Sequence, residues 1–181
     1  MTVYTIGHSN RKLEEFIYLL RSAKLNRLVD VRAYPNSRRH PQYESTRLRL
    51  ALANNGINYV WNGQWLGGFR RERPGSPHRA LTSASLRAYA DYMQTTGFHT
   101  AVKELMVLAD TARLALMCAE KDPLRCHRSM IADYLNVIGV RVFHLIDEEK
   151  GIQHRLSALA RREGNQLFYD RCEAAQLTVR I

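Results

Sequence analysis

The sequence predicts a single α/β domain with a mostly parallel five-stranded sheet and helices on both faces. Three observations predict it. Apolar runs of strand length alternate along the chain with segments whose apolar residues recur at helical spacing. Strand, helix and strand follow one another within the first 32 residues, an order that requires parallel pairing and a right-handed crossover. Polar residues with chemically useful side chains come directly after each expected strand.

Five strands are expected from apolar runs bounded by turn residues. They lie at Val3–Ile6, Leu28–Val31, Ile57–Trp61, Leu114–Met117 and Val140–Ile146. Apolar residues at helical spacing predict helices at Leu13–Leu20, Arg47–Asn55, Ser85–Met93, Val102–Ala109, Ile131–Ile138 and Gly151–Arg162. Ser9 or Asn10 can cap the first of these helices. The stretch 62–82 is expected to be a long loop, and the stretch 166–181 remains unassigned.

Length and composition favour one domain over residues 1–181, because 181 residues with 45% hydrophobic side chains can bury a proper core. No apolar run is long enough to span a membrane, and the first residues have the pattern of a strand rather than a secretion signal. Three cysteines at irregular spacing do not form a disulfide framework. We therefore expect a cytoplasmic protein with no membrane partner.

The net charge is +10, and 22 arginines outnumber five lysines. Between Arg32 and Arg79 there are nine arginines and two acidic residues. A guanidinium binds phosphate or carboxylate with two parallel hydrogen bonds, which an ammonium cannot do. This excess predicts a polyanionic partner, nucleic acid first. The alternative is a solvated basic face without a specific partner.

The stretch Leu114–Gly139 carries the densest chemistry. The apolar strand stops at Cys118-Ala119-Glu120, and a proline-bearing loop then leads through Arg125-Cys126-His127-Arg128 to a helix. In a parallel sheet, ligands bind where the strands end and the helices begin, because free N–H groups are available there. We therefore expect the functional site at this edge.

Four residues are candidates for catalysis. Glu120 and His8 are suited to proton transfer. Cys118 is a possible nucleophile that His127 or His8 would activate. The structural alternatives are a core role for Cys118 and an ion pair of Glu120 with Arg128 or Arg32.

The residues expected to bind an anionic substrate follow the strands or belong to the arginine-rich loops. They are Ser9, Asn10, Arg32, Arg38, Arg39, Trp65, Gly67, Gly68, Arg125 and Arg128. Asp30 is expected to orient Arg32 or His8 without contacting the substrate itself. Trp65 and Phe69 could stack on a base, or they could simply pack the long loop. Because closely spaced cysteine pairs are absent, we expect neither a metal nor another cofactor.

Five motifs occur in order along most of the chain. They are Thr5-Ile6-Gly7-His8-Ser9, Val29-Asp30-Val31-Arg32 with Pro35 and Ser37-Arg38 after it, Trp65-Leu66-Gly67-Gly68, Met117-Cys118-Ala119-Glu120, and Cys126-His127-Arg128. Together they resemble the DUF488 family, a group named as a domain of unknown function. The resemblance implies a small Rossmann-like α/β domain. Its members have no agreed activity, and some carry loose DNA-repair labels.

A second likeness, to rhodanese-like domains, concerns architecture only. Those domains also have a Val-Asp-Val-Arg strand and a later strand that ends in cysteine. Their catalytic loop needs an arginine six residues after that cysteine, whereas Leu124 occupies this position and Arg125 follows it. The spacing therefore argues against sulfur transfer or phosphate-ester cleavage by Cys118.

The leading functional hypothesis is an enzyme that performs a hydrolytic or lyase step on a nucleic acid or nucleotide. Glu120 and His8 would transfer protons, while Arg32 and Arg128 would hold the anion. Two alternatives remain open. One is a nucleic-acid-binding module without catalysis, and the other is an enzyme for a phosphorylated or carboxylated metabolite.

Overall fold

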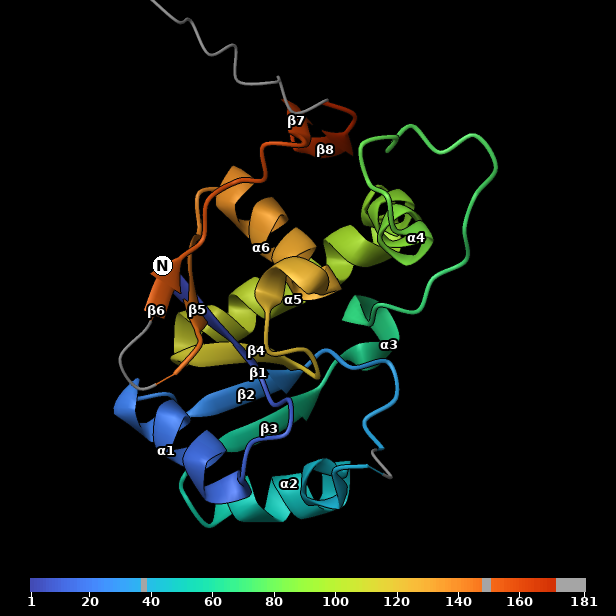
Figure 1. Cartoon of the computed structure of the whole chain (residues 1–181). Helices are drawn as coiled ribbons and strands as arrows, with labels where there is room; N and C mark the ends of the chain where they lie inside the picture. The colour runs from blue at the N-terminus through green and yellow to red at the C-terminus, as the bar shows by residue number, and fades with distance from the viewer. Residues whose placement is uncertain (37–38, 148–150, 172–181) are drawn as a thin grey trace, which may run out of the picture.

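The computed structural model describes residues 1–36, 39–147 and 151–171. These residues form a six-stranded sheet in the order β3-β2-β4-β1-β5-β6 and a separate hairpin, β7-β8 (Figure 1). The first five strands pair in parallel, and β6 is antiparallel to β5. The strands are β1 (Thr2–Gly7), β2 (Arg27–Asp30), β3 (Asn58–Trp61), β4 (Leu114–Cys118), β5 (Arg141–Leu145), β6 (Gly151–Gln153), β7 (Ala160–Glu163) and β8 (Gln166–Tyr169). The predicted α/β class is confirmed, with six strands in the sheet rather than five.

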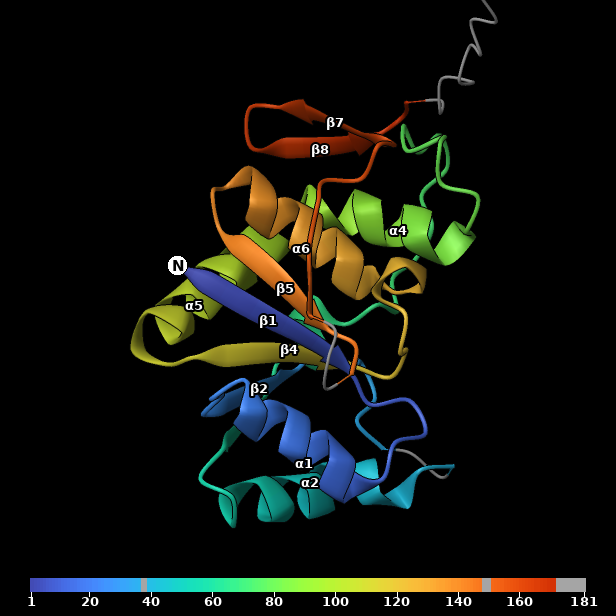
Figure 2. The same cartoon turned by 60° about the vertical axis from the view of Figure 1, so that its left-hand side comes forward.

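Helices cover both faces of the sheet, as the sequence predicts (Figures 1 and 2). They are α1 (Leu13–Ser22), α2 (Ser45–Ala53), α3 (Gly63–Leu66), α4 (Ala84–Met93), α5 (Thr96–Thr111) and α6 (His127–Val137). Two short 3₁₀ turns, Pro41–Tyr43 and Pro123–Arg125, precede α2 and α6. None of the helices in the described residues is long and apolar enough to cross a membrane.

The alternation of side chains along β4 divides the hydrophobic core into two layers. Ala115 and Met117 pack with α1 and α2 on one face. Leu114, Leu116 and Cys118 pack with α4, α5 and α6 on the other face. Successive strand residues point to opposite faces, so this pattern follows from the apolar run itself. It also places the Cys118 side chain on the side of α6.

The expected cap of the first helix is wrong. Helix α1 begins at Leu13, and its N-cap is Lys12, whose side chain makes no capping hydrogen bond. Ser9 lies in the left-handed region at φ 49°, within the turn that follows β1. Its backbone N–H donates to the carbonyl of Ala119 at 2.8 Å, which ties this turn to the loop after β4.

The expected helix at Gly151–Arg162 is also wrong, because this stretch contains strands β6 and β7. Its helical spacing of apolar residues is misleading, since Ile152 is 54% exposed. Pairing of β6 with the outer side of β5 satisfies backbone groups of β5 that would otherwise face solvent. In the unassigned stretch, Gln166–Tyr169 forms β8, and residues 172–181 lie outside the described ones.

A chain of buried polar groups fastens this C-terminal part to the sheet. Thr5 Oγ1 lies 2.7 Å from His144 Nδ1, and His144 Nε2 lies 2.9 Å from His154 Nδ1. His154 Nε2 continues the chain to Asp133 on α6 at 2.9 Å, and Tyr169 on β8 donates to the same carboxylate at 2.8 Å. Buried polar groups need such partners, so this network fixes where β6 and β8 lie.

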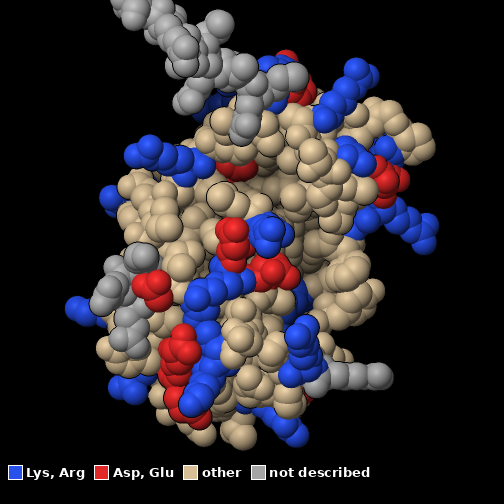
Figure 3. Space-filling model, in the orientation of Figure 1, with Lys and Arg blue, Asp and Glu red and all other residues tan. Residues whose placement is uncertain are grey.

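Charged side chains of both signs are interspersed on the face seen in Figure 3. On this face the lysines and arginines do not form one continuous basic surface, because acidic side chains lie between them. The arginine excess of the sequence is therefore distributed here rather than gathered into a single stripe.

Acid is expected to weaken the fold because two buried histidines stay neutral in it. Burial lowers the pKa of His144 to about 3 and that of His8 to about 4, from an ordinary value of 6.5. At a pH between the lowered pKa of each histidine and 6.5, the unfolded chain binds more protons than the folded one. The free energy of unfolding therefore decreases as the pH falls from about 6.5 towards 4. Urea unfolding followed by circular dichroism across this range measures the effect, and a constant free energy would contradict it.

Candidate functional site

A cavity of about 400 Å³ lies at the carboxyl ends of the parallel strands. The loops after β2, α3 and β4 line it, together with the first residues of α4 and α6. The residues that matter for its chemistry are Arg32, Tyr34, Phe69, Arg70, Glu120 and His127. Its volume lies within the range of pockets that bind small ligands. This is the edge where the sequence places the site.

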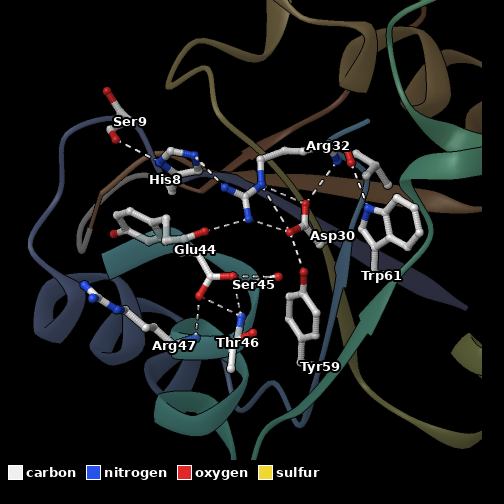
Figure 4. A network of polar contacts seen from close by, with 12 residues as sticks. His8, Ser9, Asp30, Arg32, Glu44, Ser45, Thr46, Arg47, Tyr59 and Trp61 are labelled. Atoms are coloured by element: carbon white, nitrogen blue, oxygen red, sulfur yellow. Dashed lines mark hydrogen bonds and ion pairs between the residues drawn. The ribbon is translucent and has the colours of Figure 1, made fainter. Parts of the chain in front are cut away.

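Arg32 is held at the inner wall by a buried ion pair with Asp30 (Figure 4). Its Nη2 donates to Asp30 Oδ2 at 2.6 Å and to the carbonyl of Tyr43 at 2.9 Å. The hydroxyl of Tyr59 donates to Asp30 Oδ2 at 2.7 Å. Burial opposes the charge of Arg32, but the hydrogen bonds and charge of Asp30 raise the pKa of the guanidinium above its ordinary value. Because Asp30 compensates this charge, Arg32 is a poor candidate for holding a substrate anion.

His8 lies behind Arg32 and does not line the cavity. Its Nδ1 faces the carbonyl of Ser9 at 2.8 Å, and its Nε2 faces Arg32 Nη1 at 3.4 Å. A carbonyl can only accept, so Nδ1 carries the hydrogen and Nε2 accepts from the guanidinium. The ring also stacks on Tyr43 at 4.2 Å between centroids. With both nitrogens engaged, His8 supports Arg32, and its expected role in proton transfer remains a prediction.

Glu120 lies exposed at the cavity, directly after β4. Among the described residues its carboxylate forms no ion pair, since Arg32 pairs with Asp30 and Arg128 lies elsewhere. The structural alternative for Glu120 is therefore absent from this part of the chain. A carboxylate with free lone pairs beside a cavity can accept a proton from water or from a substrate.

Two cysteines form the floor of the cavity. Cys118 ends β4 and Cys126 is the N-cap of α6, and their Sγ atoms lie 2.9 Å apart. Burial raises the pKa of the Cys118 thiol well above its ordinary value. The hydrogen bond shared with Cys118 lowers the pKa of Cys126, against the effect of burial, and His127 and Arg128 lower it further.

Arg128 does not reach the cavity, although the sequence suggested that it would hold an anion there. Its side chain is fully buried beneath Cys118. Arg125, three residues earlier, is exposed and lines the cavity. Near the start of α6 the helix therefore directs one arginine inward, while the preceding turn leaves the other at the mouth.

Several expected binding residues lie away from the cavity. Trp65 lines a separate hollow with Trp61 and Val107 of α5. Ser9 and Asn10 belong to the turn after β1, and Arg39 lies exposed in the loop before α2. Arg38 falls outside the described residues.

The two neighbouring glycines permit close approach of the α3 loop. A Cβ on Gly68 would lie 2.7 Å from His127 Nδ1, and one on Gly67 would lie 2.2 Å from the carbonyl of Gly63. Only glycine allows this loop to cover His127 without displacing the ring.

Some cavity residues with polar or reactive side chains were not identified from the sequence as site residues. They include Tyr34, Arg70 and Cys126. The rings of Tyr34 and Phe69 meet edge to face at 5.4 Å, and both are mostly exposed. Arg70 stacks on the ring of Tyr92 at 3.6 Å and donates to the carbonyl of Trp65. The cluster of arginines in the long loop indicated that one of them could bind a ligand. The sequence pattern could not show that Arg70 is the one that lines the cavity.

No group of three or more His, Cys, Asp or Glu side chains in the described residues is arranged to hold a metal ion. Cys118 and Cys126 face each other, and His127 Nε2 faces the carbonyl of Val31 at 3.2 Å. The lining of the cavity carries thiol, carboxylate, imidazole and guanidinium groups.

The fold and this cavity define an α/β protein with a ligand-sized site at the carboxyl edge of a mostly parallel sheet. The family model "Domain of unknown function DUF488" matches residues 12–135, and the chain belongs to that family. The matched residues include Asp30, Arg32, Cys118, Glu120 and Arg128. No curated protein and no solved structure matches the chain.

A substitution at Gly7 tests the close packing between the end of β1 and the loop after β4. A Cβ at this position would lie 1.8 Å from the backbone oxygen of Glu120. The neighbouring His8 N–H donates to the carbonyl of Cys118 at 3.0 Å, so neither backbone can retreat without losing that bond. Gly7→Ala is therefore expected to lower the free energy of unfolding by about 2 kcal/mol or more.

Gly151→Ala is the matched control, because no described residue other than its chain neighbours lies within 4 Å of the Cβ that it would add. Urea unfolding of both variants measures the difference. An equal effect of the two substitutions would show that β1 and β4 are not in close contact at this point.

Proposed function

We propose that the protein is an enzyme that acts on a nucleotide, either free or as one unit of a nucleic acid, bound in the cavity. The observation that supports this best is the exposed Tyr34–Phe69 ring pair at the mouth, beside Arg70 and Arg125. Aromatic faces stack on bases, and guanidinium groups bind phosphates. The cavity combines both kinds of contact with a free carboxylate.

Two arginines with different partners would meet the phosphate. Arg70 is held in place by the ring of Tyr92 and by two backbone carbonyls, those of Gln64 and Trp65. Its Nε is buried and has no hydrogen-bond partner among the residues that the structure describes. Arg125 is exposed and more adaptable. Arg70 is already positioned to bind an anion, and Arg125 can adjust to it. Together they favour the binding of an anion that enters from solvent.

The proposed chemistry is a hydrolytic or lyase step with Glu120 as the general base. Its carboxylate would take a proton from water or from the substrate, while the arginines hold the anionic group. The mixed charges on the face of Figure 3 favour recognition of one nucleotide unit over a long polymer track.

Substitutions at the mouth are expected to weaken nucleotide binding. Phe69→Ala removes a stacking face, and Arg70→Ala removes a phosphate contact, so each is expected to raise the Kd by about tenfold. Fluorescence titration with mononucleotides and short single strands of DNA and RNA measures this, at two salt concentrations.

Arg21→Ala is the control, because Arg21 is an exposed arginine of α1 on the opposite face of the sheet. It removes the same charge far from the cavity. An equal loss in Arg21→Ala and Arg70→Ala, or no salt-dependent binding by the unmodified protein, would overturn the proposed binding site.

Glu120→Gln separates catalysis from binding. This substitution keeps the shape of the side chain and removes its basicity, so turnover is expected to fall by about a hundredfold with little change in Kd. The measurement is hydrolysis of a nucleotide panel by chromatography, with Glu104→Gln of α5 as a control on an exposed carboxylate. If turnover is unchanged in Glu120→Gln, Glu120 is not the general base.

A further inference from the structure

The two cysteines at the cavity floor form a contact that the proposed nucleotide chemistry does not use. Cys118 and Cys126 are both free, and only 2% and 6% of their surfaces are exposed. They come from the end of β4 and the start of α6, eight residues apart, yet their sulfurs lie 2.9 Å from each other. Both border the same cavity as Arg70 and Arg125.

A buried positive charge lies beside this pair. The Arg128 side chain is fully buried, and Nη1 contacts Cys118 Sγ at 3.2 Å while Nη2 donates to the carbonyl of Lys121. In the described residues its Nε has no hydrogen-bond partner, and no carboxylate forms an ion pair with it. Burying an uncompensated guanidinium is costly. A thiolate within the cysteine pair would supply the missing negative charge.

The geometry around His127 indicates which sulfur is deprotonated first. His127 Nε2 lies 3.2 Å from the Val31 carbonyl, which can only accept, so Nε2 carries a hydrogen. Nδ1 is then free to take the proton of Cys126, whose Sγ lies 3.4 Å away. The backbone N–H of Arg128 also points at Cys126 Sγ, as expected for an N-cap. A helix N-terminus and a nearby cation both favour the thiolate form.

We propose that Cys126 and Cys118 are a redox-active dithiol that reduces small anionic disulfides bound in the cavity. The substrate must be small because, in the described part of the chain, both sulfurs are nearly buried and border the cavity. It should be anionic because Arg70 and Arg125 line the approach. This activity goes beyond the proposed nucleotide chemistry and does not depend on it.

The reaction has two exchange steps. The Cys126 thiolate attacks one sulfur of the substrate, the substrate disulfide breaks, and one half leaves as a thiol after taking up a proton. Cys118 then loses its proton, with Arg128 stabilising the thiolate, and attacks Cys126 Sγ. The second half leaves, and a Cys118–Cys126 disulfide remains. Two electrons have passed from the dithiol to the substrate, and an external dithiol restores the reduced protein.

The test uses the full chain with Cys172→Ser, so that the two cavity cysteines are the only thiols. The probe is oxidised glutathione, a small disulfide with several carboxylates, and the readout is the mass of the intact protein. The dithiol protein is expected to lose two hydrogen atoms and release two thiols. With Cys118→Ser added, it is expected to retain one half of the probe as a mixed disulfide on Cys126.

With Cys126→Ser added instead, reaction is expected to be slower by at least about a hundredfold, because Cys118 is the more buried, protonated sulfur. A neutral disulfide of similar size should react about tenfold more slowly than the anionic one, and Arg70→Ala should reduce that preference. Dithiothreitol should restore the reduced mass.

Three results would overturn the proposal. They are an unreacted dithiol protein, a mixed disulfide that forms on Cys118 rather than Cys126, and equal rates with anionic and neutral probes. The first protein tested keeps both Cys118 and Cys126. A folding defect in one of the cysteine variants therefore does not decide the outcome. Nucleotide binding is measured separately on the reduced protein, and its failure would leave these results unaffected.

Discussion

The buried ion pair between Asp30 and Arg32 holds the carboxyl edge of the sheet together. Removing both charges from water costs several kcal/mol, and only full hydrogen bonding offsets this cost. The pair achieves it by drawing in Tyr59 from β3, the Tyr43 carbonyl before α2, and His8 from the turn after β1. The carbonyl of Arg32 also accepts a hydrogen bond from Trp61. One ion pair thus fixes three chain segments around the inner wall of the cavity.

Asp30 compensates the charge of Arg32, so the uncompensated positive charges near the cavity are those of other arginines. These arginines have two kinds of surroundings. Arg70 and Arg125 line the cavity and can meet an anion that arrives from solvent. Arg128 is buried below the floor, where Cys118 and a carbonyl are its neighbours. Under the two proposals, the same residue type would attract the substrate at the mouth and stabilise a thiolate at the floor.

The sequence predicts the fold well because its signals are local. Leu48 and Leu52 recur at helical spacing and are buried in α2 as expected. The rule that parallel strands end at a common edge places Arg32, Cys118 and Glu120 around one cavity, whereas His8, which follows β1, lies outside its lining. Helical spacing of apolar residues misleads at Gly151–Arg162, because pairing of β6 with β5 outweighs a weak helical pattern there.

Side-chain direction is the part that the sequence could not supply. Arg125 and Arg128 are three residues apart, yet the turn before α6 leaves one exposed and the helix buries the other. Trp65 faces α5 rather than the cavity, while Tyr34, which carries no distinctive motif, reaches the mouth. Cys126 gains its chemistry from being an N-cap beside Cys118, a contact set by how β4 and α6 meet.

Calorimetric titration of the reduced protein with a nucleoside and with its monophosphate tests the proposed site most directly. Stacking on Phe69 and Tyr34 predicts measurable binding of the nucleoside. The guanidinium groups of Arg70 and Arg125 predict that the phosphate tightens binding by about tenfold or more, with a gain that shrinks as salt is added. Equal affinities for the two ligands, or no binding of either, would contradict a nucleotide site in this cavity.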